Sequence, residues 1–174
     1  GKKKHEEFLK SFEVFDLREA IKKIKHGEKC VFSEFSVLDE KFGLIGKIDC
    51  ISFTGKIINN KNQAFITEYK FSNVKNFLPL SWKIQIAGYA SSIKNSYLGK
   101  ICELAGARII CLDYENKIQK TFSFGNERIE KWLENLESLT KHARDLISSN
   151  SAKHIRFDID AVSYTHLRAH ETGR

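Results

Sequence analysis

The chain has 174 residues, a length that fits one domain, and its 41% hydrophobic content with 13 Phe is enough for a buried core, which excludes a disordered chain. The formal charge is +7, from 29 Lys and Arg against 22 Asp and Glu. This surplus favours a polyanionic partner, with nucleic acid first, over an acidic or neutral one. The alternative is a lysine-rich soluble protein without such a partner.

Cysteine usage and hydropathy indicate where the protein works. Four cysteines are present with no CxxC pair, and Cys50 lies in an apolar stretch where a reduced, buried thiol is typical. We therefore expect a reducing, cytoplasmic environment. No apolar run approaches the roughly 18 residues of a membrane span and no basic-then-apolar leader is present, so we expect no membrane partner.

The two ends of the sequence differ from the rest. The chain contains no Met and begins at Gly1, as a fragment would. The stretch from Val162 to Arg174 departs from the Lys-, Ile-, Asn- and Phe-rich composition before it, and it resembles translated sequencing-adapter DNA. We expect one domain over residues 1–161, truncated at both ends, and a non-native tail at 162–174.

The first part of the chain predicts two helices and then three strands. Apolar residues at helical spacing indicate helices over Lys2–Phe12 and Asp16–Lys25, with Asp16 as N-cap and His26-Gly27 as the stop. Alternating apolar residues and polar breaks then predict, in order, a strand at 29–39, a turn at 40–43, a strand at 44–53, a loop at 54–63 and a strand at 64–71.

The second part predicts a helix, a hairpin and a long helix. Ser81 can cap a helix over 80–95 that puts Trp82, Gln85 and Tyr89 on one side. The segments that follow are strands at 107–115 and 117–124 and an amphipathic helix at 126–147. The order of elements predicts a single α/β domain in which helices pack on a sheet.

Two acidic residues interrupt the strand-like stretches. Glu68 and Lys70 share one face of their strand, because strand side chains alternate. A hairpin would bring Asp49 of the preceding strand beside Glu68. Paired carboxylates repel unless a cation joins them, and oxygen ligands suit Mg²⁺ or Mn²⁺. Lys70 could then serve the water that attacks a phosphate. The alternative is an ordinary salt bridge on a solvent-facing side.

The order of these residues resembles the PD-(D/E)XK nuclease superfamily. GKIDCI and ITEYKFS match its D…(D/E)xK signature at Asp49, Glu68 and Lys70, and WKIQIAGYA matches the QxxxY helix of the RecB-like branch at Gln85 and Tyr89. Mitochondrial genome maintenance exonucleases and their phage relatives share this layout. The resemblance spans residues 1 to about 139 and implies a restriction-endonuclease-like core, with a central mixed β-sheet flanked by helices.

The resemblance also implies a metal shell. Asp49, Glu68 and the Tyr69 carbonyl would hold Mg²⁺ or Mn²⁺. GKKKHEEFL is similar to the leading GxxxH helix of the branch, which implies His5 as a further ligand, although a lone His on a helix is more often an ordinary surface or core residue. Glu34, on the first strand, could be an additional acid near the metal or could pair with a local lysine.

The QxxxY pair has two interpretations. Gln85 and Tyr89 lie one helical turn apart, and in the family such a pair braces the active site and the DNA. The alternative is a helix that packs Tyr89 into the core and leaves Gln85 in solvent. Some relatives hold an iron–sulfur cluster through one early and three late cysteines, a ligand set that this sequence lacks, so no cluster is expected.

The resemblance implies metal-dependent hydrolysis of DNA phosphodiester bonds, by an exonuclease that acts on single-stranded ends in DNA repair or recombination. A helicase or a replication or repair protein is the kind of partner it would have. One alternative is a catalytically silent nucleic-acid-binding module that keeps the fold. Another is a site-specific endonuclease, which usually adds a sequence-reading region that this chain does not show.

Overall fold

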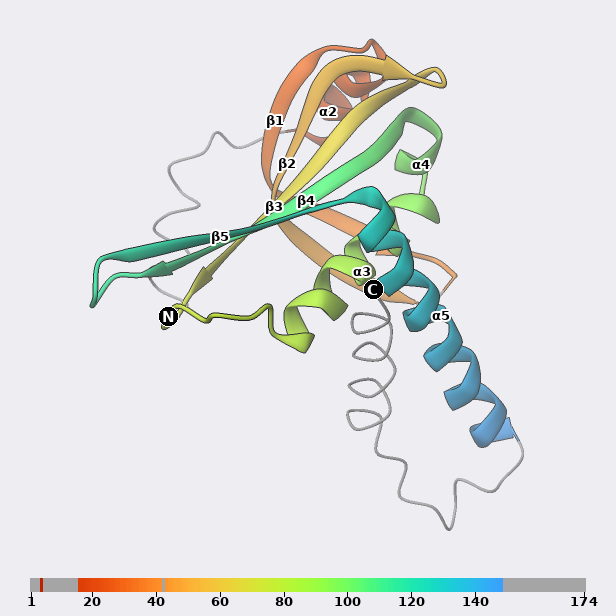
Figure 1. The fold of residues 1–174 in the computed structure, drawn as a ribbon. Helices are drawn as coiled ribbons and strands as arrows, with labels where there is room; N and C mark the ends of the chain where they lie inside the picture. The colour runs from red at the N-terminus through yellow and green to blue at the C-terminus, as the bar shows by residue number, and fades with distance from the viewer. Residues whose placement is uncertain (1–3, 5–15, 42, 149–174) are drawn as a thin grey trace.

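The computed structural model describes Lys4 and residues 16–41 and 43–148, which form helices around a five-stranded mixed sheet in the order β1-β2-β3-β4-β5 (Figure 1). Neighbouring strands are antiparallel except β3 and β4, which are parallel. The elements are α2 (Leu17–Lys25), β1 (Lys29–Asp39), β2 (Leu44–Ile58), β3 (Lys61–Phe71), α3 (Leu80–Lys94), α4 (Leu98–Ile101), β4 (Cys102–Asp113), β5 (Ile118–Gly125) and α5 (Asn126–Ser148). The predicted fold class, an α/β protein with a central mixed sheet flanked by helices, is confirmed.

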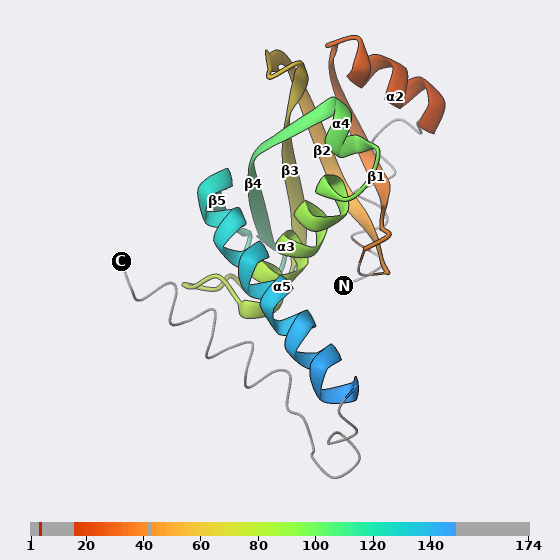
Figure 2. The ribbon, with the colours of Figure 1, turned by 90° about the vertical axis from the view of Figure 1, so that its right-hand side faces the viewer.

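Helices α3, α4 and α5 lie together on one face of the sheet (Figure 2). For α3 and α4 this follows from the parallel pairing, since a chain that leaves β3 needs a crossover connection before it can enter β4 in the same direction. Helix α5 follows β5 and packs against α3. The core lies between the two layers. Trp132 of α5 packs edge-on against Phe124 of β5 with ring centroids 4.8 Å apart, and Ile86 of α3 is fully buried.

Helix α2 begins and ends as the sequence predicts. The Asp16 side chain accepts a hydrogen bond from the backbone N–H of Arg18, which satisfies one of the donors that every helix leaves at its start. Gly27 follows the helix with a φ of 73°, in the left-handed region that glycine enters at little cost. The predicted helix over Lys2–Phe12 and the predicted tail at 162–174 lie outside the described residues, apart from Lys4.

Residues 54–63 form a hairpin, as predicted, but the predicted length of its loop is wrong. Strands β2 and β3 continue through most of it, and only Asn59 and Asn60 form the turn. Both asparagines have positive φ, 50° and 62°, which matches the two-residue hairpin turn that suits the twist of antiparallel strands. Gly55, with a φ of 79°, lies where the register of the two strands shifts, so the polar stretch is a bulged hairpin.

Three other predicted boundaries change. Ser81 is not the cap of α3, which begins at Leu80 after Pro79 in an extended conformation. Strand β4 begins at Cys102, five residues before the predicted start, because its first part pairs with β3. The short helix α4 was not predicted. Among the helices of the described part, none is long and apolar enough to cross a membrane.

Candidate active site

Asp49 and Glu68 meet where β2 and β3 separate. The regular pairing of β2 with β3 ends where Cys50 lies opposite Thr67. Beyond this pair, a backbone N–H of each strand donates to a carboxylate of the other. The backbone N–H of Asp49 donates to Glu68 Oε1 at 2.9 Å, and the backbone N–H of Tyr69 donates to Asp49 Oδ2 at 2.9 Å. Each carboxylate is thus anchored by an amide of the opposite strand.

Both carboxylates are buried, and this raises the pKa of Glu68. Asp49 is 6% exposed and Glu68 2% exposed. Burial disfavours the charged form, and the nearby charge of Asp49 adds to this, so the pKa of Glu68 rises from an ordinary value near 4.5 to about 8. The Asp49 N–H and the charge of Lys70 act in the opposite direction. Glu68 therefore binds its proton more tightly than an ordinary carboxyl group does.

A chain of hydrogen bonds connects Lys70 to β2. The Lys70 amino group donates to Gln85 Oε1, Gln85 Nε2 donates to the Tyr89 hydroxyl at 3.1 Å, and that hydroxyl donates to the Lys47 carbonyl at 2.8 Å. An ammonium group only donates, so it fixes the orientation of the Gln85 amide. Helix α3 thus links β3 to β2 two residues before Asp49.

Tyr89 reaches β2 because Gly46 leaves room for its ring. A Cβ on Gly46 would lie 2.9 Å from Tyr89 Cε1, which is closer than such atoms approach. The Tyr89 ring is 7% exposed, and burial, followed by the charges of Glu68 and Asp49, raises the pKa of its hydroxyl. The hydroxyl therefore keeps its proton and remains a donor.

The structure bears on one of the two interpretations of the QxxxY helix, the one in which the helix packs Tyr89 into the core and leaves Gln85 in solvent. Tyr89 packs into the core, as the structural alternative proposed, but Gln85 contacts Lys70 instead of pointing only to solvent. Two residues beside the site, Gly46 and Trp82, were not among the predicted site residues. Gly46 precedes the acid in the GKID segment, and Trp82 lies one turn before Gln85 on α3.

Strand β1 has an unusual backbone beside Asp49. Ser33 pairs with Cys50 and Phe35 with Ile48, so the intervening Glu34 lies opposite Asp49. Glu34 has a φ of 51°, which is uncommon for a residue other than glycine, and its side chain is exposed. The described residues contain no group of three or more His, Cys, Asp and Glu side chains that could hold a metal, so Glu34 does not join the two acids.

The remaining predicted ligands divide into two cases. Tyr69 follows Glu68 directly, and its N–H is hydrogen-bonded to Asp49, which places its backbone at the site. His5 lies outside the described residues. The structure therefore brings together all the predicted site residues that it describes: Asp49, Glu68, Tyr69, Lys70, Gln85 and Tyr89.

A concave region lies on the face of the sheet opposite to helices α3, α4 and α5. It has a volume of about 560 Å³ and is lined by Phe65, Thr67, Arg108 and Ser123 among others. Arg108 is held there by a 3.0 Å hydrogen bond from its Nε to the Thr67 hydroxyl. The lining contains no carboxylate, so this region lacks the groups for metal-assisted chemistry. The candidate active site is instead the acid pair, whose two carboxylates are both buried and lie side by side.

The arrangement combines two anionic oxygen donors with a lysine held by a neutral amide. The acid pair has the donor chemistry that hard divalent cations prefer. The hydrogen bond to Gln85 gives the Lys70 amino group a fixed direction, and Gln85 contributes no negative charge to this contact. A scan against protein-family models finds no family that matches this chain, and a search of curated proteins finds no match.

Proposed function

We propose that this protein hydrolyses phosphodiester bonds of DNA with Mg²⁺ or Mn²⁺, as an exonuclease that acts on single-stranded ends. The observation that carries the proposal is the pair of buried carboxylates, Asp49 and Glu68, each anchored by an amide of the opposite strand. A buried acid beside another acid is costly in a protein that uses neither for chemistry.

The donor set fits a divalent cation. Asp49 and Glu68 would hold the ion together with the Tyr69 carbonyl, and His5 is a further candidate from the sequence. The raised pKa of Glu68 supports this, since a cation would favour the charged form of both acids. When bound, such an ion would polarise a phosphate oxygen and help to activate water. The chain's own part is to keep both carboxylates fixed and largely out of bulk water.

Lys70 is the proposed partner of the reacting phosphate. Its amino group is oriented by Gln85, and Tyr89 holds Gln85 against the Lys47 carbonyl. An ammonium oriented in this way can orient the attacking water or offset the charge that grows on the phosphate. Gln85 and Tyr89 act through Lys70 in this proposal and are positioning residues.

The nature of the substrate rests on charge and on the resemblance described above. A formal charge of +7 favours a polyanion, and the motifs at Asp49, Glu68 and Lys70 are similar to those of exonucleases. The fold class agrees with the resemblance, although many unrelated functions use α/β folds. A helicase or another replication or repair protein is a proposed partner.

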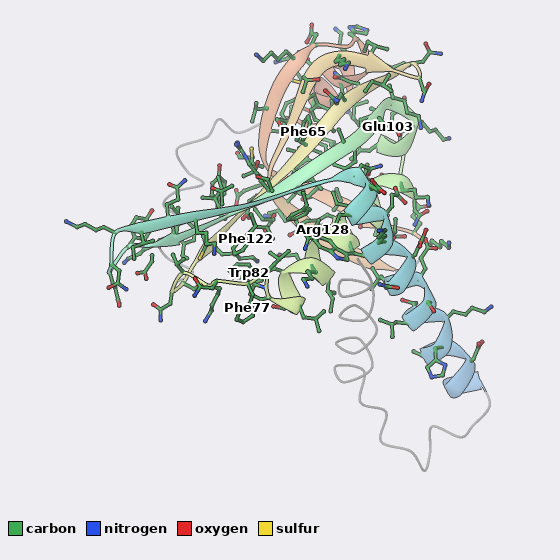
Figure 3. All side chains as sticks on the ribbon, in the orientation of Figure 1. Phe65, Phe77, Trp82, Glu103, Phe122 and Arg128 are labelled. Atoms are coloured by element: carbon green, nitrogen blue, oxygen red, sulfur yellow. The ribbon has the colours of Figure 1, made fainter. Side chains whose placement is uncertain are left out.

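The test compares a linear single strand of DNA with the same sequence closed into a circle, in Mg²⁺ and in excess EDTA. We expect degradation of the linear strand only, and only with the metal. Asp49→Asn and Glu68→Gln should abolish cleavage. Glu103→Gln is the matched control, because this acid lies on β4, is partly exposed and pairs with Lys61 at 3.8 Å (Figure 3).

The other outcomes identify the competing functions. Equal cleavage of the linear and circular strands would favour an endonuclease. Tight binding without cleavage of either would favour a silent nucleic-acid-binding module. Cleavage that persists in EDTA would exclude the metal-dependent mechanism. A label at the 5′ or 3′ end gives the polarity of degradation.

A further inference from the structure

Two aromatic rings continue outward from the candidate active site. Trp82 of α3 lies one turn before Gln85, and its ring is in edge-to-face contact with Phe122 of β5, with centroids 6.3 Å apart. Figure 3 shows Trp82 and Phe122 between the start of α3 and the β4–β5 hairpin. Neither ring is fully buried, so both have surface that can contact a ligand.

Lysines lie at both ends of this pair. The Lys70 amino group is 5.9 Å from the centroid of the Trp82 ring, and the Lys120 amino group is 5.1 Å from the centroid of the Phe122 ring. The result is a row in which two neighbouring rings lie between two lysines, and we call it the cation–aromatic row: Lys70, Trp82, Phe122 and Lys120. Since Lys70 also belongs to the candidate site, the row begins at the proposed chemistry.

The row matches the chemistry of an unpaired nucleotide chain. Proteins that hold single strands without reading sequence combine aromatic rings, on which bases stack, with cations that contact the phosphates. The bases of a duplex are already stacked on one another, so only an unpaired strand offers base faces to these rings. A partner peptide would satisfy the rings but would not explain why a lysine lies at each end.

We propose that Trp82 and Phe122 form a stacking platform for unpaired bases next to the cleavage site, with Lys70 at the reacting phosphate and Lys120 against a phosphate on the far side of the two rings. This inference rests on the proposed function and specifies which residues hold the unpaired strand beside the acid pair. It also assigns roles to two aromatic residues and one lysine outside the nuclease motifs. The platform explains how a site without sequence-reading groups can hold an end in place.

The experiment measures binding alone, in EDTA, so that its result does not depend on cleavage. The probes are fluorescent single strands of thymidine nucleotides and abasic strands of equal length, which carry the same phosphates without bases. We expect the wild-type chain to prefer the strand with bases. Trp82→Leu should weaken binding of that strand by about 5-fold or more and leave the abasic strand unchanged, because Leu has no π-face.

Three further variants separate the roles. Trp82→Phe should retain most of the preference for bases. Lys120→Ala should weaken both strands alike and reduce the salt dependence of binding, because it removes a phosphate contact. Phe65→Ala is the matched control, since Phe65 is a 36% exposed aromatic residue on the opposite face of the sheet, and it should bind like the wild type.

A fluorescence measurement checks the same contact directly. The chain has two tryptophans, and Trp132 is 2% exposed, so quenching on addition of the strand reports on Trp82. Loss of quenching in Trp82→Phe is expected. The proposal is overturned if the wild type binds both strands equally, or if Trp82→Leu lowers thermal stability without changing the preference for bases. The proposed nuclease activity is judged separately, by cleavage in Mg²⁺.

Discussion

Two buried acids near opposite ends of α3 have very different surroundings. Asp39, at the end of β1, is fully buried and accepts hydrogen bonds from the Ser91 hydroxyl, the Asn95 amide at 3.3 Å and the backbone N–H of Lys41 at 3.0 Å. Glu68 is almost as buried but lies beside a second carboxylate. The burial is similar, and the partners differ.

Asp39 forms hydrogen bonds that stabilise the fold, whereas burial of Glu68 beside a second carboxylate is unfavourable. Two neutral donors, the Ser91 hydroxyl and the Asn95 amide, connect Asp39 at the end of β1 to the C-terminal end of α3 and stabilise its charge. The charge of Glu68 is opposed by its neighbour, which raises its pKa, and only a proton or a cation relieves the repulsion. Residues whose pKa is perturbed in this way gather at functional sites.

The largest expected effect tests whether only one of the two regions carries chemistry. Lys70→Ala should lower kcat by about 10²- to 10⁴-fold, the usual range for a side chain that acts in proton transfer. Asp39→Asn should leave kcat per folded molecule unchanged, although it weakens the fold. The measurement is single-turnover cleavage of linear single-stranded DNA at saturating Mg²⁺. If Lys70→Ala is as active as the wild type, Lys70 takes no part in the reaction and has only a structural role.

The next effect is on stability and concerns Asp39. Asp39→Ala removes the acceptor of the Ser91 hydroxyl and of the Lys41 N–H and one of the two acceptors of the Asn95 amide, so the free energy of unfolding should fall by about 1–3 kcal/mol. Urea unfolding followed by circular dichroism measures this fall. Glu40→Ala, which removes an exposed acid next in sequence, is the control. If the free energy of unfolding of Asp39→Ala equals that of the wild type within error, the hydrogen bonds to Asp39 do not stabilise the fold.

Glu68→Gln should change stability in the opposite direction. A folded-state pKa of about 8 against an ordinary value near 4.5 means that the folded protein retains a proton that the unfolded chain loses. In the metal-free wild type, the contribution of Glu68 to stability is therefore fully present below about pH 4.5 and is lost as the pH rises through about 8. Glutamine does not ionise, so the variant should melt at least about 2–4 °C higher at pH 8, equivalent to 1 kcal/mol or more.

The pH dependence distinguishes this effect from a general change in packing. The difference between Glu68→Gln and the wild type should shrink toward pH 5, and Mg²⁺ should reduce it at pH 8 by stabilising the wild type alone. Thermal melts at several pH values, with and without EDTA, give both trends. A constant difference at all pH values would mean that Glu68 is not the titrating group.

The smallest effect concerns the support of the site by α3. Tyr89→Phe removes the hydrogen bond to the Lys47 carbonyl and the one from Gln85, so stability should fall by about 0.5–1.5 kcal/mol. Activity should fall only a few-fold, because the ring still packs against Gly46. Tyr97→Phe, on a residue that is 48% exposed, is the matched control. Equal melting temperatures for the two variants would mean that the hydrogen bonds of the Tyr89 hydroxyl do not contribute to stability.

The sequence by itself determined the features that depend on local pattern. Alternation predicted β1 over its full length, the Asp16 cap and the Gly27 stop marked α2, and helical spacing put Gln85 and Tyr89 on one side of α3. The order of Asp49, Glu68 and Lys70 on neighbouring strands also pointed to their association. These features can be predicted from the sequence because they depend on a few residues that are close together in the chain.

The tertiary structure decided what depends on residues far apart in the chain. The hydrogen bond from the Ser91 hydroxyl to Asp39 joins residues 52 positions apart, and the contact between Trp82 and Phe122 exists only because β4 and β5 pass the start of α3. The parallel pairing of β3 with β4 likewise extended β4 to Cys102, where the local pattern showed no strand. Such contacts depend on which strands become neighbours, and periodicity within one segment carries no information about that choice.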